Sequence, residues 1–170
     1  MITILPIAQV DPLAVEQLLD RAFGTDRQLR TAYRIREGMT ALETLSFAAV
    51  ETGHLVATIQ CWPIRFDGDG GRDLAMVMVG PVAVEPARQR DGIGREMMRH
   101  ALDEAEALGE ADALMLIGDP EYYGRFFGFT AERTGQWRVP GPVEPHRLLA
   151  RGATVPTGAG ILGPRIEVVA

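Results

Sequence analysis

The sequence predicts a mixed α/β fold, of the α+β type, in a single domain. Two observations carry this prediction. Strand-like runs joined by tight turns lie between residues 45 and 84, a pattern typical of antiparallel hairpins. Between residues 76 and 117 a strand, a helix and a strand follow one another, which favours parallel strands joined by a right-handed crossover. The chain has 170 residues, 46 % of them hydrophobic, and is therefore long enough to bury one sizeable core.

The N-terminal quarter is predicted to contain one strand and two helices. Residues 2–7 alternate between apolar and small residues, as a strand does. Asp11 and Pro12 predict the start of a helix, because aspartate caps helices and proline suits the first helical position. Its apolar stripe runs through residues 13–23 and ends at a glycine, and a second helix is expected at residues 26–37.

The central part of the chain is predicted to form successive antiparallel strands. Apolar runs at residues 45–51 and 54–66 flank a tight turn at Thr52 and Gly53, so we expect a hairpin. A second turn at residues 67–71 leads into a strand at residues 73–84.

The clearest helix is predicted at residues 92–108, where apolar residues recur at three- and four-residue steps up to Gly109. A short apolar run at residues 111–117 then reads as a buried strand. From residue 130 onward, prolines and glycines separate short apolar pieces, including residues 147–150 and 166–169. We expect these to form a late hairpin or edge strands.

Composition narrows the class of protein. The formal net charge is −6, which disfavours a nucleic-acid partner, and all 17 basic residues are arginine. No apolar run is long enough to span a membrane, and the N-terminus lacks a basic leader, so the expected location is the cytoplasm. The single cysteine, Cys61, lies in an apolar strand and is expected to be a core residue. No cluster has metal-ligand spacing, and we expect no metal.

The most informative stretch is the loop between the strand at residues 73–84 and the following helix. Gln89, Arg90 and Arg95 lie there beside Gly92 and Gly94. Glycines let the backbone approach a ligand closely, and the amides at a helix N-terminus favour an anion such as a pyrophosphate. A dinucleotide fingerprint would need a third glycine at position 97, and a P-loop would need a lysine, which this chain lacks. A simple tight turn is the remaining alternative.

Residues 89–94, Gln-Arg-Asp-Gly-Ile-Gly, match the Gln/Arg-x-x-Gly-x-Gly/Ala signature of the GCN5-related N-acetyltransferase (GNAT) family, in which this segment holds the acetyl-CoA pyrophosphate. Residues 118–129 resemble the family's tyrosine-bearing helix, most closely in its YhbS-like branch. The resemblance implies a mostly antiparallel sheet with splayed parallel strands at the cofactor site and helices on both faces. It also implies that acetyl-CoA is the co-substrate. The implied cofactor-binding residues are Val82, Val84, Gln89, Arg90, Asp91, Gly92, Ile93, Gly94 and Arg95.

The resemblance also implies the catalytic chemistry. A backbone N–H near Val82 and Val84 would polarise the thioester carbonyl, and Tyr123, or alternatively Tyr122, would protonate the departing sulfur. The tyrosine stands one position earlier than in many members, which leaves the choice between the two open. Many members carry an asparagine after the strand, and this chain has none, so Asp119 or a backbone group would have to serve. The general base is left open among Glu85, His54 and His146.

The expected function is acetyl-CoA-dependent transfer of an acetyl group to a primary amine of a small molecule, peptide or protein. A second hypothesis is an enzyme of the same fold that transfers a different acyl group or acts on a hydroxyl acceptor. The competing class is a non-catalytic acyl-CoA-binding or interaction module of the same fold. In the resembled family, the segment matching residues 24–34 lines one side of the acceptor pocket, and residues 131–170 are expected to close it. A homodimer is compatible with the resemblance, whereas nucleic acid and membrane are not expected as partners.

Overall fold

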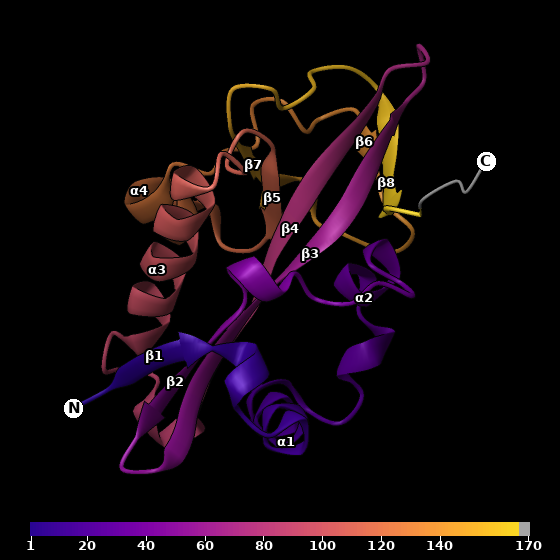
Figure 1. Cartoon of the computed structure of the whole chain (residues 1–170). Helices are drawn as coiled ribbons and strands as arrows, with labels where there is room; N and C mark the ends of the chain where they lie inside the picture. Colours follow the sequence, from indigo (N-terminus) through magenta and orange to yellow (C-terminus); the bar gives the residue numbers. More distant parts are fainter. Residues whose placement is uncertain (167–170) are drawn as a thin grey trace. The chain divides into compact units, whose positions relative to one another are not determined.

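A computed structural model describes residues 1–166 of the chain (Figure 1). The strands are β1 (Thr3–Pro6), β2 (Phe47–Glu51), β3 (His54–Gly68), β4 (Asp73–Val84), β5 (Leu114–Ile117), β6 (Trp137–Arg138), β7 (Leu148–Arg151) and β8 (Gly160–Pro164). The α-helices are α1 (Pro12–Phe23), α2 (Thr31–Ile35), α3 (Ile93–Ala107) and α4 (Pro120–Phe127). None of the helices within residues 1–166 has the length and apolar character needed to cross a membrane.

The chain divides into two compact units, each built from three separate stretches of sequence. The first unit comprises Met1–Gln28, Ala41–Cys61 and Gly80–Gly109. The second unit comprises Leu29–Thr40, Trp62–Val79 and the residues from Glu110 onward. Strands β3 and β4 pass from one unit to the other and supply residues to both. That the whole chain forms a single domain stays a prediction.

The sheet of the first unit is antiparallel, as the sequence predicts. β1 pairs with β2, and β2 pairs with the first half of β3. The turn between β2 and β3 has positive φ at both central residues, 47° at Thr52 and 77° at Gly53. Two positive φ angles define the type I′ turn that matches the twist of paired strands. The predicted hairpin is therefore confirmed.

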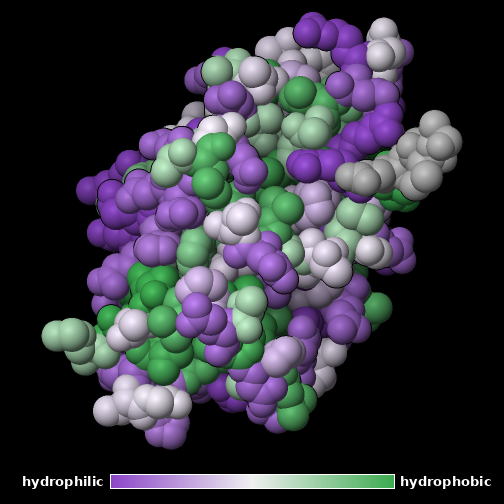
Figure 2. All heavy atoms as spheres, in the orientation of Figure 1, coloured by the Kyte–Doolittle hydropathy of each residue, from purple (hydrophilic) through white to green (hydrophobic). Residues whose placement is uncertain are grey.

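Helices cover both faces of this part of the sheet. Ala83 packs in the apolar cluster formed by Val15, Leu18 and Leu19 of α1. A Cβ atom at Gly94 of α3 would contact methyl groups of Val84 and Val82, at 3.5 and 3.7 Å. Neighbouring residues of a strand point to opposite faces, so α1 and α3 lie on opposite sides of β4. Hydrophilic residues, purple in Figure 2, gather at the upper left of that view, over part of the place that α3 occupies in Figure 1.

The predicted ends of α1 and α3 are also confirmed. The Asp11 carboxylate accepts a hydrogen bond of 3.0 Å from the Leu13 amide, and Pro12 occupies the first turn of α1. α3 ends just before Gly109, whose φ of 72° lies in the left-handed region. Glycine stops a helix in this way because it adopts that conformation without a Cβ penalty.

The helix predicted at residues 26–37 is wrong in length. The structure has a 3₁₀ turn at Arg27–Leu29 and a short α2 instead. Arg30 is extended between them, with φ −71° and ψ 149°, so no continuous helix can form. Arg27 is buried and ion-paired to Glu16 and Asp20 of α1, with 3.0 Å between Nε and the Asp20 Oδ1. These ion pairs, to residues 7 and 11 positions earlier in the chain, stabilise a turn that the helical pattern alone does not predict.

In the second unit, the later half of β3 and the first half of β4 form a hairpin that turns at residues 68–72, where the Gly68 amide donates to the Arg72 carbonyl at 2.8 Å. β4 runs parallel to β5, and the register pairs Val77 with Leu114 and Met78 with Met115. This pairing confirms the predicted parallel crossover. β5 is antiparallel to β7, β8 is antiparallel to β3, and β6 is parallel to β8.

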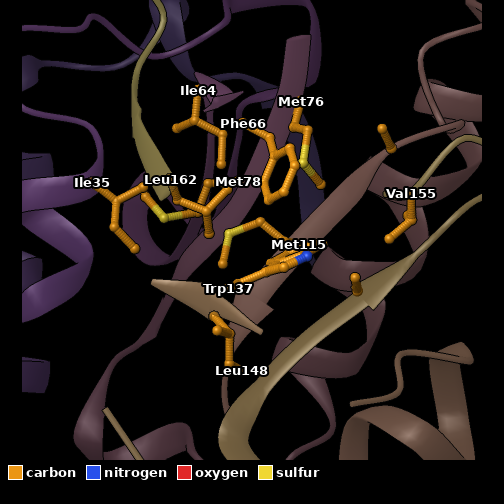
Figure 3. Close-up of a cluster of buried hydrophobic side chains, with 12 residues drawn as sticks. Ile35, Ile64, Phe66, Met76, Met78, Met115, Trp137, Leu148, Val155 and Leu162 are labelled. Atoms are coloured by element: carbon orange, nitrogen blue, oxygen red, sulfur yellow. The ribbon is translucent and has the colours of Figure 1, made fainter. Parts of the chain in front are cut away.

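The core of the second unit is a cluster of apolar side chains from α2 and the strands (Figure 3). Alternate residues of two strands point into it, including Ile64 and Phe66 of β3 and Met76 and Met78 of β4. The rings of Phe66 and Trp137 lie 5.3 Å apart between centroids.

The segment after residue 130 forms edge strands rather than a hairpin. β7 and β8 pair with different strands, β5 and β3 respectively, and not with each other. The expected apolar piece at residues 166–169 lies, beyond Ile166, outside the described residues.

Candidate functional site

The loop after β4 leads into the start of α3, where a glycine leaves open space. The Glu85 amide donates to the Val56 carbonyl at 2.8 Å, which anchors the loop to β3. A 3₁₀ turn at Pro86–Arg88 follows, and Gly92 then adopts φ 79° immediately before α3. A Cβ atom at Gly92 would meet nothing within 4 Å, so the space beside this glycine is open. The first N–H groups of α3 have no partner within the helix and can bind an anion.

The structure brings together several of the predicted cofactor residues around this helix start. Gly94 lies against Val82 and Val84, and the side-chain amide of Gln89 donates to the Val84 carbonyl at 3.5 Å. Ile93 is only 3 % exposed, so it can offer a ligand its backbone but not its side chain. The exposed residues of the set are Gln89, Arg90, Asp91, Gly92 and Arg95.

Arg88 fastens this loop to the β2–β3 hairpin. Its Nη1 and Nη2 atoms lie 3.0 and 3.3 Å from the two carboxylate oxygens of Glu51, and its Nε lies 2.5 Å from Oδ2 of Asp91. The hydrogen bonds from Arg88 hold the pKa of the Glu51 carboxyl below its ordinary value. Asp91 therefore shapes the loop through its side chain, because Arg88 already occupies its carboxylate.

Sequence analysis missed Arg88. The contact between Arg88 and Asp91 has a signal in the sequence, because arginine and aspartate stand three residues apart in a loop that must hold a fixed shape. The contact between Arg88 and Glu51 has no such signal, since the two residues are 37 positions apart in sequence. Only the hairpin register brings Glu51 to the loop.

Glu85, one of the open candidates for general base, is ion-paired. Arg21 of α1 donates to both of its carboxylate oxygens, from Nε to Oε1 at 3.1 Å and from Nη2 to Oε2 at 2.8 Å. Both oxygens of the carboxylate are therefore engaged by Arg21. A catalytic role for Glu85 stays a prediction.

The predicted tyrosines lie in the second unit, on α4. The Asp119 carboxylate caps this helix by accepting from the Glu121 amide at 3.0 Å, and Gly128, with φ 73°, ends it. Asp119 is thus engaged as a helix cap. The ring of Tyr123 packs directly on Gly118 at the end of β5, where a Cβ atom would collide with the ring. Gly118 therefore leaves room for the phenol.

The two tyrosines differ in their surroundings. Burial raises the pKa of Tyr123 above its ordinary value; Tyr122 and Asp119 add to the rise, and Arg147 opposes it. The phenol of Tyr123 is therefore held in its protonated form at neutral pH. The ring of Tyr122 packs edge-on against that of Tyr123, at 4.9 Å between centroids, and also with the ring of Phe126 at 5.4 Å.

The remaining candidates are less suited to chemistry. Cys61 is buried, and burial raises the pKa of its thiol to about 12, so it is a core residue as predicted. His146 is exposed, with Nε2 3.3 Å from a carboxylate oxygen of Glu144, and His54 is exposed at the start of β3. Within residues 1–166, no three or more histidine, cysteine or carboxylate side chains are grouped so as to hold a metal ion.

Comparison with known proteins identifies the family. The family model described as an acetyltransferase (GNAT) domain matches residues 6–131. The uncharacterised N-acetyltransferase YhbS of Escherichia coli K12 is 28 % identical over 144 residues, covering 82 % of this chain and 83 % of that protein. The chain therefore belongs to the GNAT acetyltransferase family.

Solved structures agree with this assignment. The crystal structure of E. coli YhbS in complex with CoA superposes with a TM-score of 0.69 at 25 % identity, covering 95 % of this chain and 88 % of that one. A GNAT acetyltransferase from Brucella melitensis, in complex with acetyl-CoA, gives a TM-score of 0.54 at 28 % identity and covers 90 % and 97 %. The mixed, mostly antiparallel sheet with its parallel pair is thus the GNAT fold, and the resemblance to the YhbS branch is confirmed.

Proposed function

We propose that this protein transfers the acetyl group of acetyl-CoA directly to a primary amine of a small molecule, peptide or protein. The observation that carries the proposal is the helix start at Gly92, where the space beside the glycine is open and the first amides of α3 have no partner within the helix. In a chain of the GNAT family, these amides are suited to the pyrophosphate of acetyl-CoA. Two related proteins crystallised with CoA and with acetyl-CoA support the same ligand.

The cofactor would be held mainly by backbone groups of the loop. The amides of Ile93, Gly94 and Arg95 stand at the positive end of the α3 dipole, and the exposed side chains of Gln89, Arg90 and Arg95 surround them. Backbone groups of Val82 and Val84 would pair with the amides of the pantetheine arm. Asp91 would contribute by keeping Arg88, and with it the loop, in place.

The chemistry would follow in one direct transfer. The neutral amine attacks the thioester carbonyl, and a backbone N–H near Val82 to Val84 stabilises the developing oxyanion. The carbon–sulfur bond breaks, and the departing thiolate takes up the proton of Tyr123. The acetylated nitrogen releases its extra proton to water, and Tyr123 regains a proton from water. The raised pKa of Tyr123 supports its role as the acid, and Tyr122 is the alternative. Most of the rate gain would come from holding amine and thioester together.

Thermal unfolding with and without millimolar acetyl-CoA tests the cofactor site. A ligand at about 100 times its Kd should raise the Tm of the wild-type protein by about 5 to 10 °C, because it binds only the native state. Gly92→Glu should lose this rise, since it places a carboxylate where the phosphates bind.

The chain supplies a matched control for this variant at the other end of the same helix. Gly109 has φ 72° and open space around its Cβ position, like Gly92 with φ 79°. Gly109→Glu therefore introduces the same backbone strain and the same charge away from the loop. If both variants lose the rise in Tm, or if neither does, the loop is not the cofactor site.

A non-catalytic acyl-CoA-binding module is the second candidate, because the chain lacks the family's asparagine and Asp119 is engaged as a helix cap. Such a module would show the rise in Tm but would acetylate no amine. A panel of amines and of acyl-CoA donors, followed by release of free thiol, separates this candidate from an N-acetyltransferase. The same panel tests a hydroxyl acceptor or a longer acyl group.

A further inference from the structure

An arginine of the second unit, Arg147, lies close to the phenol of Tyr123. Both residues meet at Gly118, the residue that follows β5. The Gly118 amide donates to the Arg147 carbonyl at 2.9 Å, which continues the pairing of β5 with β7. The ring of Tyr123 packs on the same glycine, where a Cβ atom would collide with two carbon atoms of the ring. Packing within this unit therefore makes Arg147 and Tyr123 neighbours, although they belong to different elements.

The side chain of Arg147 is half-buried without a counter-ion. Within residues 1–166, its guanidinium has no ion-pair or hydrogen-bond partner. The nearest carboxylate along the chain, that of Glu144, lies beside His146 instead, with 3.3 Å between Oε2 and Nε2. By contrast, Arg138 of the same unit donates to both carboxylate oxygens of Asp69. Charged side chains are rarely withdrawn from water without a partner, so the position of Arg147 needs an explanation.

The charge of Arg147 acts on the phenol of Tyr123. Burial raises the pKa of this phenol most, and Tyr122 and Asp119 raise it further. Arg147 has the opposite effect, because a nearby cation favours the negatively charged phenolate. The other charged residues of α4, at positions 121 and 125, are exposed. Arg147 therefore makes the phenolate of Tyr123 less costly than burial alone would.

Proton donation by Tyr123 creates this phenolate. In the proposed transfer, the O–H bond of Tyr123 breaks as the departing thiolate takes up the proton. A negative charge then remains on the phenol oxygen in a poorly solvated place. A cation that is already in position stabilises this charge and lowers the barrier to proton transfer. Arginine suits the task, because it stays charged throughout the pH range in which enzymes work.

We propose that Arg147 is a positioning residue for the acid Tyr123, and that its guanidinium stabilises the phenolate left when the proton passes to the thiolate. This inference rests on the transferase function proposed above. Arg147 exchanges no proton and forms no covalent bond, and the phenolate regains its proton from water. Loss of the charge should therefore make Tyr123 a weaker acid and leave acetyl-CoA binding unchanged.

Titration of the tyrosine phenols by NMR tests the electrostatic effect without any ligand. The chain has three tyrosines, so carbon-13 labelling at Cζ gives three signals, which Tyr123→Phe and Tyr122→Phe assign. Arg147→Met should raise the pKa of Tyr123, because it removes the cation that opposes the rise. Arg147→Lys, which keeps the charge, should raise this pKa less. Arg125→Met is the matched control: it removes an exposed arginine of the same helix and should leave the pKa unchanged.

Steady-state kinetics test the consequence for the reaction. Arg147→Met should lower kcat about threefold to tenfold, as expected for one partly exposed charge interaction. The alkaline limb of its pH profile should move to higher pH, because the phenol then loses its proton later. Arg147→Lys should keep most of kcat, and both variants should keep the rise in Tm with acetyl-CoA.

Three results would overturn the inference. The first is an unchanged pKa of Tyr123 in Arg147→Met. The second is an equal loss of kcat in Arg147→Met and Arg147→Lys, since the charge would then be irrelevant. The third is loss of the rise in Tm in Arg147→Met, because the arginine would then bind the cofactor.

The proposed function can fail separately. A protein that shows the change in the pKa of Tyr123 but acetylates no amine loses the proposed function. A protein that acetylates amines without this change keeps the proposed function and loses only the role of Arg147.

Discussion

The cofactor loop and the tyrosine helix are held by different physical means. The loop is exposed, and charged side chains keep its shape: Arg88 joins Glu51 to Asp91, and Arg21 binds Glu85. α4 is held by its caps and by aromatic packing around Tyr122 and Tyr123. In the proposed function the loop acts through backbone amides, whereas α4 acts through one phenol. Substitutions in the loop should therefore change binding, and substitutions in α4 should change the rate of the chemical step.

The largest effect is expected from Tyr123→Phe. Removing a general acid typically lowers the rate by a factor of about 100 or more, so kcat should fall by that order. The rise in Tm with acetyl-CoA should remain. Tyr122→Phe is the matched control, since it removes the same atom one residue away. If Tyr122→Phe has the larger effect, the two residues exchange roles; if neither changes kcat, the acid is another group.

The pH profile of kcat tests the role of Tyr123 as the acid in a second way. Because the pKa of Tyr123 is raised, its proton is present throughout the neutral range and is lost only as the pH rises above the ordinary value for tyrosine. The wild-type protein should therefore lose activity only at strongly alkaline pH, and Tyr123→Phe should lack that alkaline limb.

A smaller effect is expected from Arg88→Gln. The substitution releases the loop from Glu51 and Asp91, so the Kd for acetyl-CoA should rise about threefold to tenfold, as expected for partly exposed ion pairs. The kcat at saturating acetyl-CoA should stay close to that of the wild type. Isothermal titration and steady-state kinetics measure the two quantities.

Arg138→Gln is the control for this prediction. Arg138 forms a bidentate ion pair with Asp69, at 2.6 and 2.9 Å, in the second unit. If Arg138→Gln weakens acetyl-CoA binding as much as Arg88→Gln does, the cause is the general loss of a surface charge and not the loss of the ion pairs that Arg88 forms with the loop.

The smallest effect is expected for Glu51 and concerns stability. Its pKa is lowered in the folded state by Arg88, so its contribution to stability is present above the unfolded-state pKa and is lost as the pH falls through the folded-state pKa. Glu51→Gln should lower Tm by a few degrees at neutral pH. The difference from the wild type should shrink in acid, below the ordinary glutamate pKa. A constant difference across pH would contradict this prediction, and thermal scans between pH 3 and pH 8, roughly spanning that pKa, measure it.

Local signals made much of the fold predictable. The caps of α1, the Thr52-Gly53 turn and the end of α3 at Gly109 each depend on neighbouring residues, and all are confirmed. The break at Arg30 depends on Arg27 reaching α1, and helical periodicity carries no trace of such a contact. The helix prediction failed where ion pairs to a neighbouring helix determined the local structure.

In the candidate site, too, local features could be predicted from the sequence, whereas contacts between distant residues could not. The helix start at Gly92 and Gly94 could be found because glycine spacing and backbone geometry are local. Arg88 could not be assigned its role, since its partner Glu51 belongs to another hairpin.

The pairing of β7 with β5 and of β8 with β3 bears on how the protein can be shortened. The similarity to the family model ends at residue 131, yet both strands lie after it. A protein cut at that point would expose the backbone donors and acceptors of β3 and β5 as open sheet edges. Open edges recruit strands from other molecules, so the truncated chain should aggregate. The end of the family-model match is therefore not a suitable end for an expressed protein.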